Sequence, residues 1–170
     1  MNIALIGFRR TGKTTIAKLL TKRLDKKLIS TDEEMARKVK MSIAGFVKNF
    51  GWEKFREVES EVIENISDFD DCVFDTSAGI VMRNENLINL KKNSLIILLT
   101  ADEKTITNRI KNTKEMHALT KSNYLDEIKD VLKERESRYI GATDYTIDTS
   151  RLSPDEACDL IVHYIQTELE

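Results

Sequence analysis

The amino-acid sequence predicts an α/β fold, a three-layer α/β/α sandwich around a parallel sheet of about five strands. Short apolar runs alternate with segments of helical periodicity along the chain, a pattern typical of parallel strands joined by right-handed helical crossovers. The first apolar run also leads through a glycine-containing loop directly into a helix. That order is typical of a strand, loop and helix that bind phosphate.

Three strands are predicted in the first half of the chain. Residues 3–6 form a short apolar run, as in a central strand that is buried on both faces. Apolar residues at helical spacing follow from Lys13. Two further strands are expected over residues 28–30 and 72–74. Between these two we expect three helical segments, over residues 33–40, 43–50 and 52–67, with Ser42 as the N-cap of the middle one.

Two strands are predicted in the second half. Residues 94–99 are the most apolar run of the chain, and residues 145–147 form the last strand. A capping box at residues 153–156, with proline at the first helical position, opens the final helix. The polar stretch over residues 112–123 has little apolar periodicity, so we expect a mobile lid there. Other helices are expected near residues 87–90, 104–111 and 124–139.

The composition argues for one compact domain and against several classes of partner. The 170 residues are 41% hydrophobic, enough for one core, so residues 1–170 are taken as a single domain. A net charge of -2 argues against a nucleic-acid or membrane-surface footprint. We find no apolar stretch long enough for a membrane span and no signal-peptide pattern, and expect a cytoplasmic protein. We expect a monomer, with a dimer as the alternative, and two buried thiols, Cys72 and Cys158.

The most specific motif is the phosphate loop, or P-loop. Residues 7–14 read Gly-Phe-Arg-Arg-Thr-Gly-Lys-Thr, a complete G-x-x-x-x-G-K-[ST] match. Lys13 would reach the β and γ phosphates of ATP, and the Thr14 hydroxyl would ligate Mg²⁺. The alternative is a glycine turn followed by an ordinary surface lysine. The predicted ATP-binding residues of the loop are Gly7, Arg10, Thr11, Gly12, Lys13, Thr14 and Thr15.

Two aspartates stand at the ends of predicted strands. Asp75 follows the third strand, where a carboxylate commonly supports magnesium; a turn-forming aspartate is the alternative. Asp32 stands just past the second strand, at the edge of the sheet where ligands bind in open α/β folds. It would orient or deprotonate a substrate hydroxyl. The alternative is that Thr31 or Asp32 only caps the following helix.

Four places in the chain together resemble the shikimate kinase family. They are residues 7–15; residues 28–32 with Ser42-Ile43 downstream; the Phe-Arg-x-x-Glu element at residues 55–59; and Arg135 with Tyr139. The resemblance covers essentially the whole chain and implies a P-loop kinase fold. It implies an ATP-dependent phosphotransferase that transfers the γ-phosphoryl of ATP to a hydroxyl of shikimate, or of a related anionic metabolite, in aromatic amino acid biosynthesis.

The resemblance also implies roles for particular residues. Asp32 resembles the family aspartate that holds the acceptor hydroxyl, and with Lys13 it forms the predicted catalytic pair. Arg56 and Arg135 match two arginines that grip the acceptor carboxylate, a task suited to planar guanidinium groups. Taken alone, each arginine reads as an exposed helix residue in an ion pair. The remaining implied residues are Glu59, which would support an arginine, and Arg109 and Arg151 near the adenine, with residues 31–67 as the substrate-binding helices.

The chain departs from the family pattern in three places. Ser30 replaces a family aspartate, and we infer that Asp75 supplies the metal-supporting carboxylate instead. The family's Gly-Gly-Gly triplet is Ser77-Ala78-Gly79 here, so two side chains enter the acceptor pocket, where Ala78 and Gly79 are predicted to line the substrate. The family's lid arginine is also missing; Lys114 or Lys121 would be the available cations.

Two rival hypotheses stay open at the level of the sequence. The altered triplet and lid also suit a kinase for a different small metabolite on the same scaffold. A nucleotide-binding regulatory module with little transfer activity is the alternative from another class. A GTPase is disfavoured because the sequence has no Asn-Lys-x-Asp element for reading guanine.

Overall fold

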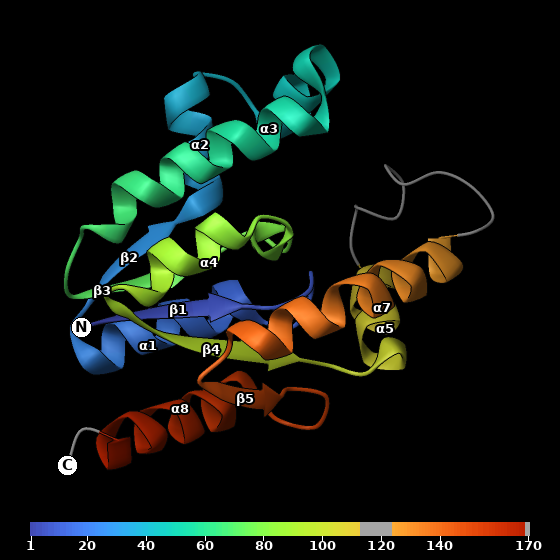
Figure 1. Cartoon of the computed structure of the whole chain (residues 1–170). Helices are drawn as coiled ribbons and strands as arrows, with labels where there is room; N and C mark the ends of the chain where they lie inside the picture. Colours follow the sequence, from blue (N-terminus) through green and yellow to red (C-terminus); the bar gives the residue numbers. More distant parts are fainter. Residues whose placement is uncertain (113–123, 169–170) are drawn as a thin grey trace.

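Five parallel strands form the centre of the molecule, in the order β2-β3-β1-β4-β5 (Figure 1). The computed structural model describes residues 1–112 and 124–168. The predicted five-stranded parallel sheet is therefore confirmed. The strands are β1 (Asn2–Ile6), β2 (Lys27–Ser30), β3 (Cys72–Asp75), β4 (Ser94–Thr100) and β5 (Tyr145–Asp148).

Helices cover both faces of this sheet. On one face α1 and α8 pack against the strands, and on the other lie α3, α4 and α7 (Figure 1). The three-layer prediction is confirmed. The helices are α1 (Lys13–Leu24), α2 (Thr31–Val39), α3 (Ile43–Ser67), α4 (Asn84–Lys91), α5 (Glu103–Lys111), α7 (Tyr124–Ala142) and α8 (Pro154–Glu168), with a 3₁₀ turn, η1, at Ile80–Met82.

The central strand β1 supplies both halves of the core. Ala4 and Ile6 pack with α3 and α4, while Ile3 and Leu5 pack with α1 and α8. All four side chains are fully buried. Because side chains alternate between the two faces of a strand, a continuous apolar run is needed when both faces are covered. The apolar sequence of residues 3–6 thus fixes β1 at the centre, with the loop after it at the carboxyl edge.

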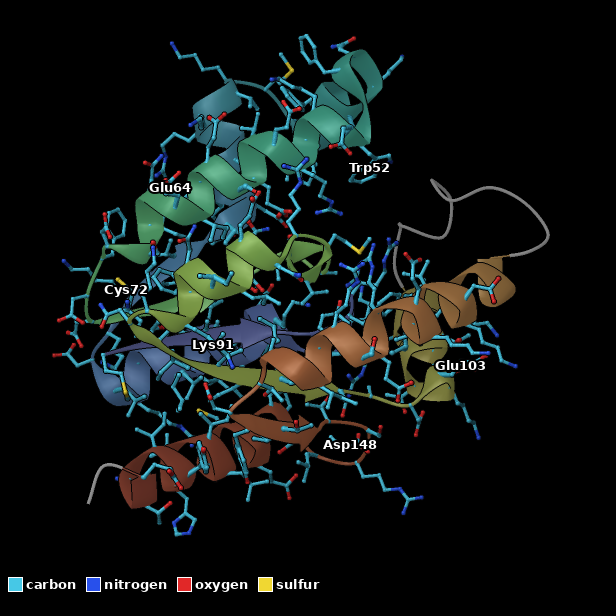
Figure 2. The ribbon with its side chains drawn as sticks, viewed as in Figure 1. Trp52, Glu64, Cys72, Lys91, Glu103 and Asp148 are labelled. Atoms are coloured by element: carbon cyan, nitrogen blue, oxygen red, sulfur yellow. The ribbon has the colours of Figure 1, made fainter. Side chains whose placement is uncertain are left out.

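Several local predictions are also confirmed. The Ser42 Oγ accepts a hydrogen bond from the Gly45 N–H and caps α3, which breaks at Gly51 (φ 82°) into the two segments expected from the sequence. The capping box holds too, since Ser153 and Glu156 exchange hydrogen bonds of 2.7 and 3.2 Å. Both cysteines are buried free thiols, Cys72 at the start of β3 (Figure 2).

Two further predictions concern a membrane span and a lid. None of the helices within residues 1–112 and 124–168 is long and apolar enough to cross a membrane. The predicted lid over residues 112–123 lies, except for Asn112, outside the described residues.

Candidate active site

The phosphate loop is shaped by its backbone. Gly7 (φ 145°), Arg10 (φ 64°) and Gly12 (φ 102°) all have positive φ, a region that favours glycine. A Cβ on Gly7 would lie 2.3 Å from the Leu99 carbonyl oxygen of β4, so no other residue fits there without moving the sheet. Thr11 Oγ1 donates to the Phe8 carbonyl at 2.8 Å and braces the loop.

Lys13 lies inside this loop. Its Nζ donates to the carbonyl oxygens of Gly7 and Phe8, at 2.8 and 2.9 Å, and the residue is only 8% exposed. Burial lowers the pKa of Lys13 to about 8, although the nearby carboxylates of Asp75 and Asp32 act in the opposite direction. The loop thus holds a desolvated ammonium group at the N-terminus of α1, where anions bind.

Thr14 and Asp75 meet beside the loop. Thr14 Oγ1 donates to Asp75 Oδ2 at 2.7 Å, across the gap between the start of α1 and the end of β3. Burial raises the pKa of the Asp75 carboxyl, opposed by the hydrogen bond from Thr14. A hydroxyl and a carboxylate are hard oxygen donors of the kind that Mg²⁺ takes together with phosphate oxygens. The residues present therefore fit a magnesium ion.

Asp32 is free to face the substrates. The alternative that Thr31 or Asp32 caps α2 is wrong, because the Ser30 Oγ accepts from the Glu33 N–H and Thr31 Oγ1 accepts from the Ser77 N–H at 2.9 Å. Burial raises the pKa of the Asp32 carboxyl, and the negative charges of Glu59 and Asp75 add to that shift. A raised pKa suits a carboxylate that takes a proton from a hydroxyl.

Two cavities meet at Asp32. One, of about 370 Å³, is bordered by the phosphate loop and Asp75. The other, of about 650 Å³, lies between α3, α7 and the segment after β3, and contains Arg56 and Arg135. Four residues line both cavities: Arg9, Asp32, Ser77 and Ala78. The structure thus brings the predicted residues of the phosphate loop next to the predicted acceptor-side residues.

Arg56 is fixed on the acceptor side by a buried network. Its Nη1 donates to Glu59 Oε2 at 2.8 Å, and the other Glu59 oxygen accepts a hydrogen bond from the Ser77 hydroxyl. Glu59 is fully buried. The Arg56 guanidinium also lies 5.0 and 5.5 Å from the ring centroids of Phe55 and Trp52. Trp52 begins the second segment of α3 (Figure 2).

Gly79 makes room for Arg56. A Cβ built on Gly79 would lie 2.0 Å from Arg56 Nη2 and 2.4 Å from its Cζ, so any side chain there would displace the guanidinium. Arg135 Nη1 and the Tyr139 hydroxyl both donate to the Ala78 carbonyl oxygen, the former at 3.3 Å. The buried Nε of Arg135 has no hydrogen-bond partner within the described part of the chain. Arg56 from α3 and Arg135 from α7 therefore line the same cavity.

A third cavity, of about 460 Å³, lies on the far side of the loop. Arg109 lines it and is held by the carbonyl oxygens of Arg10 and Thr149, both at 2.8 Å. Its position fits the predicted contact with adenine. Arg151 is exposed and does not line this cavity, so its ATP-binding role stays a prediction that the geometry does not support.

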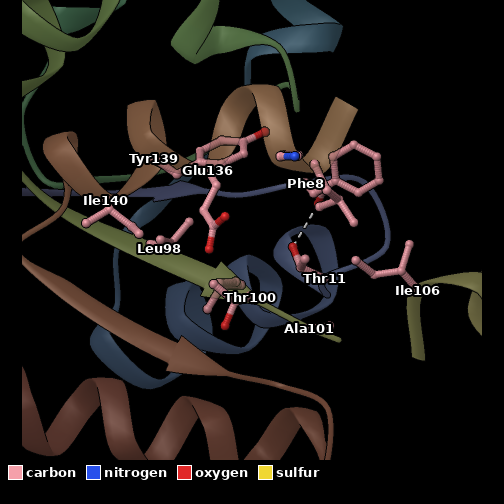
Figure 3. Close-up of a pocket in the computed structure, with 12 residues that line it drawn as sticks. Phe8, Thr11, Leu98, Thr100, Ala101, Ile106, Glu136, Tyr139 and Ile140 are labelled. Atoms are coloured by element: carbon pink, nitrogen blue, oxygen red, sulfur yellow. Dashed lines mark hydrogen bonds between the residues drawn. The ribbon is translucent and has the colours of Figure 1, made fainter. Parts of the chain in front are cut away.

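Sequence reasoning did not single out every residue of the site. Arg9 occupies one of the four unspecified positions of the loop motif, so the motif carried no information about it. The bond from Ser77 to Glu59 also went unforeseen, because it joins two segments that meet only in the fold. Nor was the cavity of about 270 Å³ behind the loop predicted; there Glu136 and Tyr139 of α7 face Phe8, Thr11 and Thr100 (Figure 3).

The fold and the site together define a class of protein. A phosphate loop with a buried lysine, a carboxylate beside its threonine and a second cavity opening at Asp32 are the parts of a P-loop phosphotransferase for a small molecule. The particular family follows from comparison with known proteins. The shikimate kinase family model matches residues 9–166, and the chain belongs to the shikimate kinase family.

Individual relatives agree with this assignment. The chain is 34% identical to the shikimate kinase of Pelotomaculum thermopropionicum, over 97% of this chain and 95% of the relative. It is 37% identical to that of Thermodesulfovibrio yellowstonii, over 95% and 92%. The structure of the Acinetobacter baumannii shikimate kinase in complex with shikimate superposes with a TM-score of 0.91, at 25% identity, over 98% of this chain and 93% of that one. The predicted family, P-loop kinase fold and ATP-dependent phosphotransferase activity on a hydroxyl are confirmed.

Proposed function

We propose that this protein phosphorylates a hydroxyl of shikimate, with ATP as donor and Mg²⁺ as the metal. One observation carries the proposal: the cavity with Arg56 and Arg135 and the phosphate-loop cavity share Asp32 in their walls. A carboxylate held by the two guanidinium groups would leave a hydroxyl of the same molecule at Asp32. The relative from Acinetobacter baumannii that binds shikimate supports this choice of acceptor.

The nucleotide side is assigned to the loop and to Arg109. Backbone N–H groups of residues 7–15 and the N-terminus of α1 would surround the phosphates. Lys13 would exchange its two carbonyl partners for phosphate oxygens, and this ion pair would raise its pKa again. Thr14 and Asp75 would hold the metal, and bound Mg²⁺ would neutralise charge on the β and γ phosphate oxygens.

The acceptor side is assigned to α2 and α3, within residues 31–67, and to Ala78, Gly79 and Arg135. Asp32 would accept a hydrogen bond from the acceptor hydroxyl and take its proton as the hydroxyl oxygen attacks the γ phosphorus. The bond from that phosphorus to the β,γ-bridging oxygen breaks at the same step, and ADP leaves with the electron pair. Arg56 and Arg135 would fix the acceptor within reach of the phosphoryl group.

Turnover of ATP by the purified protein with Mg²⁺, with and without shikimate, tests the proposal. We expect ADP release that depends on shikimate, and a singly phosphorylated shikimate by mass spectrometry; Lys13→Ala serves as the blank. Nucleotide binding without that product would contradict the proposal. A panel of other hydroxy acids would then separate a kinase for another metabolite from a regulatory module. The monomeric state and cytoplasmic location remain predictions.

A further inference from the structure

The boundary between the two substrate cavities carries a positive charge that the proposed mechanism does not use. Of the four residues that line both cavities, Arg9 is the cation and Asp32 the anion. The phosphoryl group has to cross this boundary when it passes from ADP to the acceptor. A cation here would therefore be close to the charge that develops during transfer.

Arg9 is also available to a ligand. Its side chain is exposed, its guanidinium lies 5.8 Å from the Phe8 ring centroid, and it makes no hydrogen bond or ion pair within residues 1–112 and 124–168. The other arginines of the site differ in this respect: Arg56 is tied to Glu59 and Arg135 to Ala78. The Arg9 guanidinium can therefore contact phosphate without first breaking a hydrogen bond or an ion pair to the described part of the chain.

The loop separates Arg9 from its neighbour. Arg10 takes a left-handed backbone conformation (φ 64°), and it lines the phosphate cavity and the far cavity that contains Arg109. Arg9 lines the phosphate cavity and the acceptor cavity. The two consecutive arginines thus extend the phosphate cavity in different directions, Arg10 toward the cavity of Arg109 and Arg9 toward the acceptor cavity. The charge of Arg9 is also close enough to Lys13 to contribute to lowering the pKa of Lys13.

We propose that Arg9 is a catalytic residue that binds the γ-phosphoryl group during its transfer to the acceptor. The guanidinium keeps its proton throughout and meets two phosphoryl oxygens with two parallel N–H donors. It stabilises the charge that spreads over those oxygens as the bond to the β,γ-bridging oxygen breaks and the bond to the acceptor oxygen forms. Residues 112–123 contain no arginine, so Lys114 and Lys121 are the rival cations.

Kinetics of Arg9 variants give the first test, which rests on the proposed function. Removing one electrostatic contact to a transition state costs about 100- to 1,000-fold in kcat. We expect a loss of that size for Arg9→Met, a smaller loss for Arg9→Lys, and a KM for shikimate within about threefold of the wild type. Arg23→Met is the control, an exposed arginine in the last turn of α1 that lines none of these cavities. An unchanged kcat for Arg9→Met, or an equal loss in Lys114→Met or Lys121→Met, would overturn the inference.

A binding measurement makes the test independent of the acceptor. Aluminium fluoride with MgADP mimics the transferring phosphoryl group, and calorimetry would compare it with MgADP alone. We expect Arg9→Met to bind MgADP like the wild type but MgADP with aluminium fluoride more than about tenfold more weakly, since transition-state contacts act only on the mimic. Equal affinities in the two proteins would overturn the role of Arg9. A retained difference without any shikimate product would instead refute only the choice of shikimate.

Discussion

The phosphate loop and the acceptor cavity are built in different ways. The loop is held by backbone geometry, with positive φ at Gly7, Arg10 and Gly12 and a Lys13 ammonium bound to loop carbonyls. The acceptor cavity is held by side chains that depend on one another. Ser77 donates a hydrogen bond to Glu59, and Glu59 accepts one from Arg56. The Arg56 guanidinium in turn fits only because Gly79 has no Cβ. Acceptor binding should therefore respond to substitutions that never touch the acceptor.

The largest effect is expected where the two regions meet, at Asp32. Asp32→Asn keeps the shape of the side chain but cannot take a proton, and loss of a general base lowers rates by about 100- to 10,000-fold. We expect that loss in kcat, with the KM for ATP nearly unchanged. Steady-state kinetics at saturating ATP would measure it. A variant with more than a tenth of the wild-type kcat would show that Asp32 only orients the hydroxyl.

The next effect separates the two regions. Gly79→Ala would place a Cβ 2.0 Å from Arg56 Nη2 and push the guanidinium aside. Losing a hydrogen bond to a charged group costs about 1.5–3 kcal/mol, so we expect the KM for shikimate to rise about 10- to 150-fold while ATP affinity stays constant.

Gly141→Ala in α7 is the matched control for this substitution. A Cβ there meets nothing within 4 Å, and alanine favours a helix over glycine by up to about 1 kcal/mol. Kinetics and thermal unfolding should show normal activity and equal or greater stability. Equal kinetic behaviour of the two alanine variants would contradict the role of Gly79.

On the loop side, ATP binding is expected to depend on pH. The pKa of Lys13 in the free protein is about 8, lowered from 10.5, so above that pH the free lysine loses the charge that phosphate binds. ATP binding then requires proton uptake, and its affinity should fall by up to about tenfold per pH unit from about pH 8. Calorimetry in buffers of different ionisation enthalpy would measure both quantities.

Lys13→Met should show no such decline in affinity. The stability of the free protein should respond with the opposite sign. Between about pH 8 and 10.5 the unfolded chain binds more protons at this lysine than the folded chain does, so this one group makes folding more favourable as the pH rises. Thermal unfolding of the wild type and Lys13→Met across this range would isolate the contribution.

The smallest effect is expected at Ser77. Ser77→Ala removes the hydroxyl that donates to Glu59 but leaves the bond between Glu59 and Arg56. A hydrogen bond to a charged group contributes about 1.5–3 kcal/mol, but Ser77 reaches the acceptor only through Glu59 and Arg56. We therefore expect a smaller part, about 0.5–1.5 kcal/mol, to affect acceptor binding, and the KM for shikimate to rise about two- to tenfold. Comparison of Ser77→Ala with Ser77→Thr, which restores a hydroxyl, would show whether that hydrogen bond positions Arg56 or whether the cavity depends only on side-chain size.

The phosphate loop and the acceptor cavity also differ in how far they could be predicted from the sequence. The strands, the helices and the loop could be inferred because periodicity and the glycine motif act locally, as at residues 3–6 and at Gly7. The contacts that hold Arg56 in place could not be inferred, because they depend on how α3 approaches the segment after β3. The role of Ser30 as the N-cap of α2, which leaves Asp32 free, was missed because Ser30, Thr31 and Asp32 are all residues that cap helices well.

The indole of Trp52 gives the acceptor cavity its own optical reporter. It is the only tryptophan in the chain. The residue lines the cavity and is 61% exposed, and its ring centroid lies 5.5 Å from the Arg56 guanidinium. All indole emission from the protein therefore arises beside the group assigned to the acceptor carboxylate. Because the fluorescence of an indole responds to nearby charge and to loss of water, binding of the acceptor can be followed by tryptophan fluorescence, without ATP and without any attached dye.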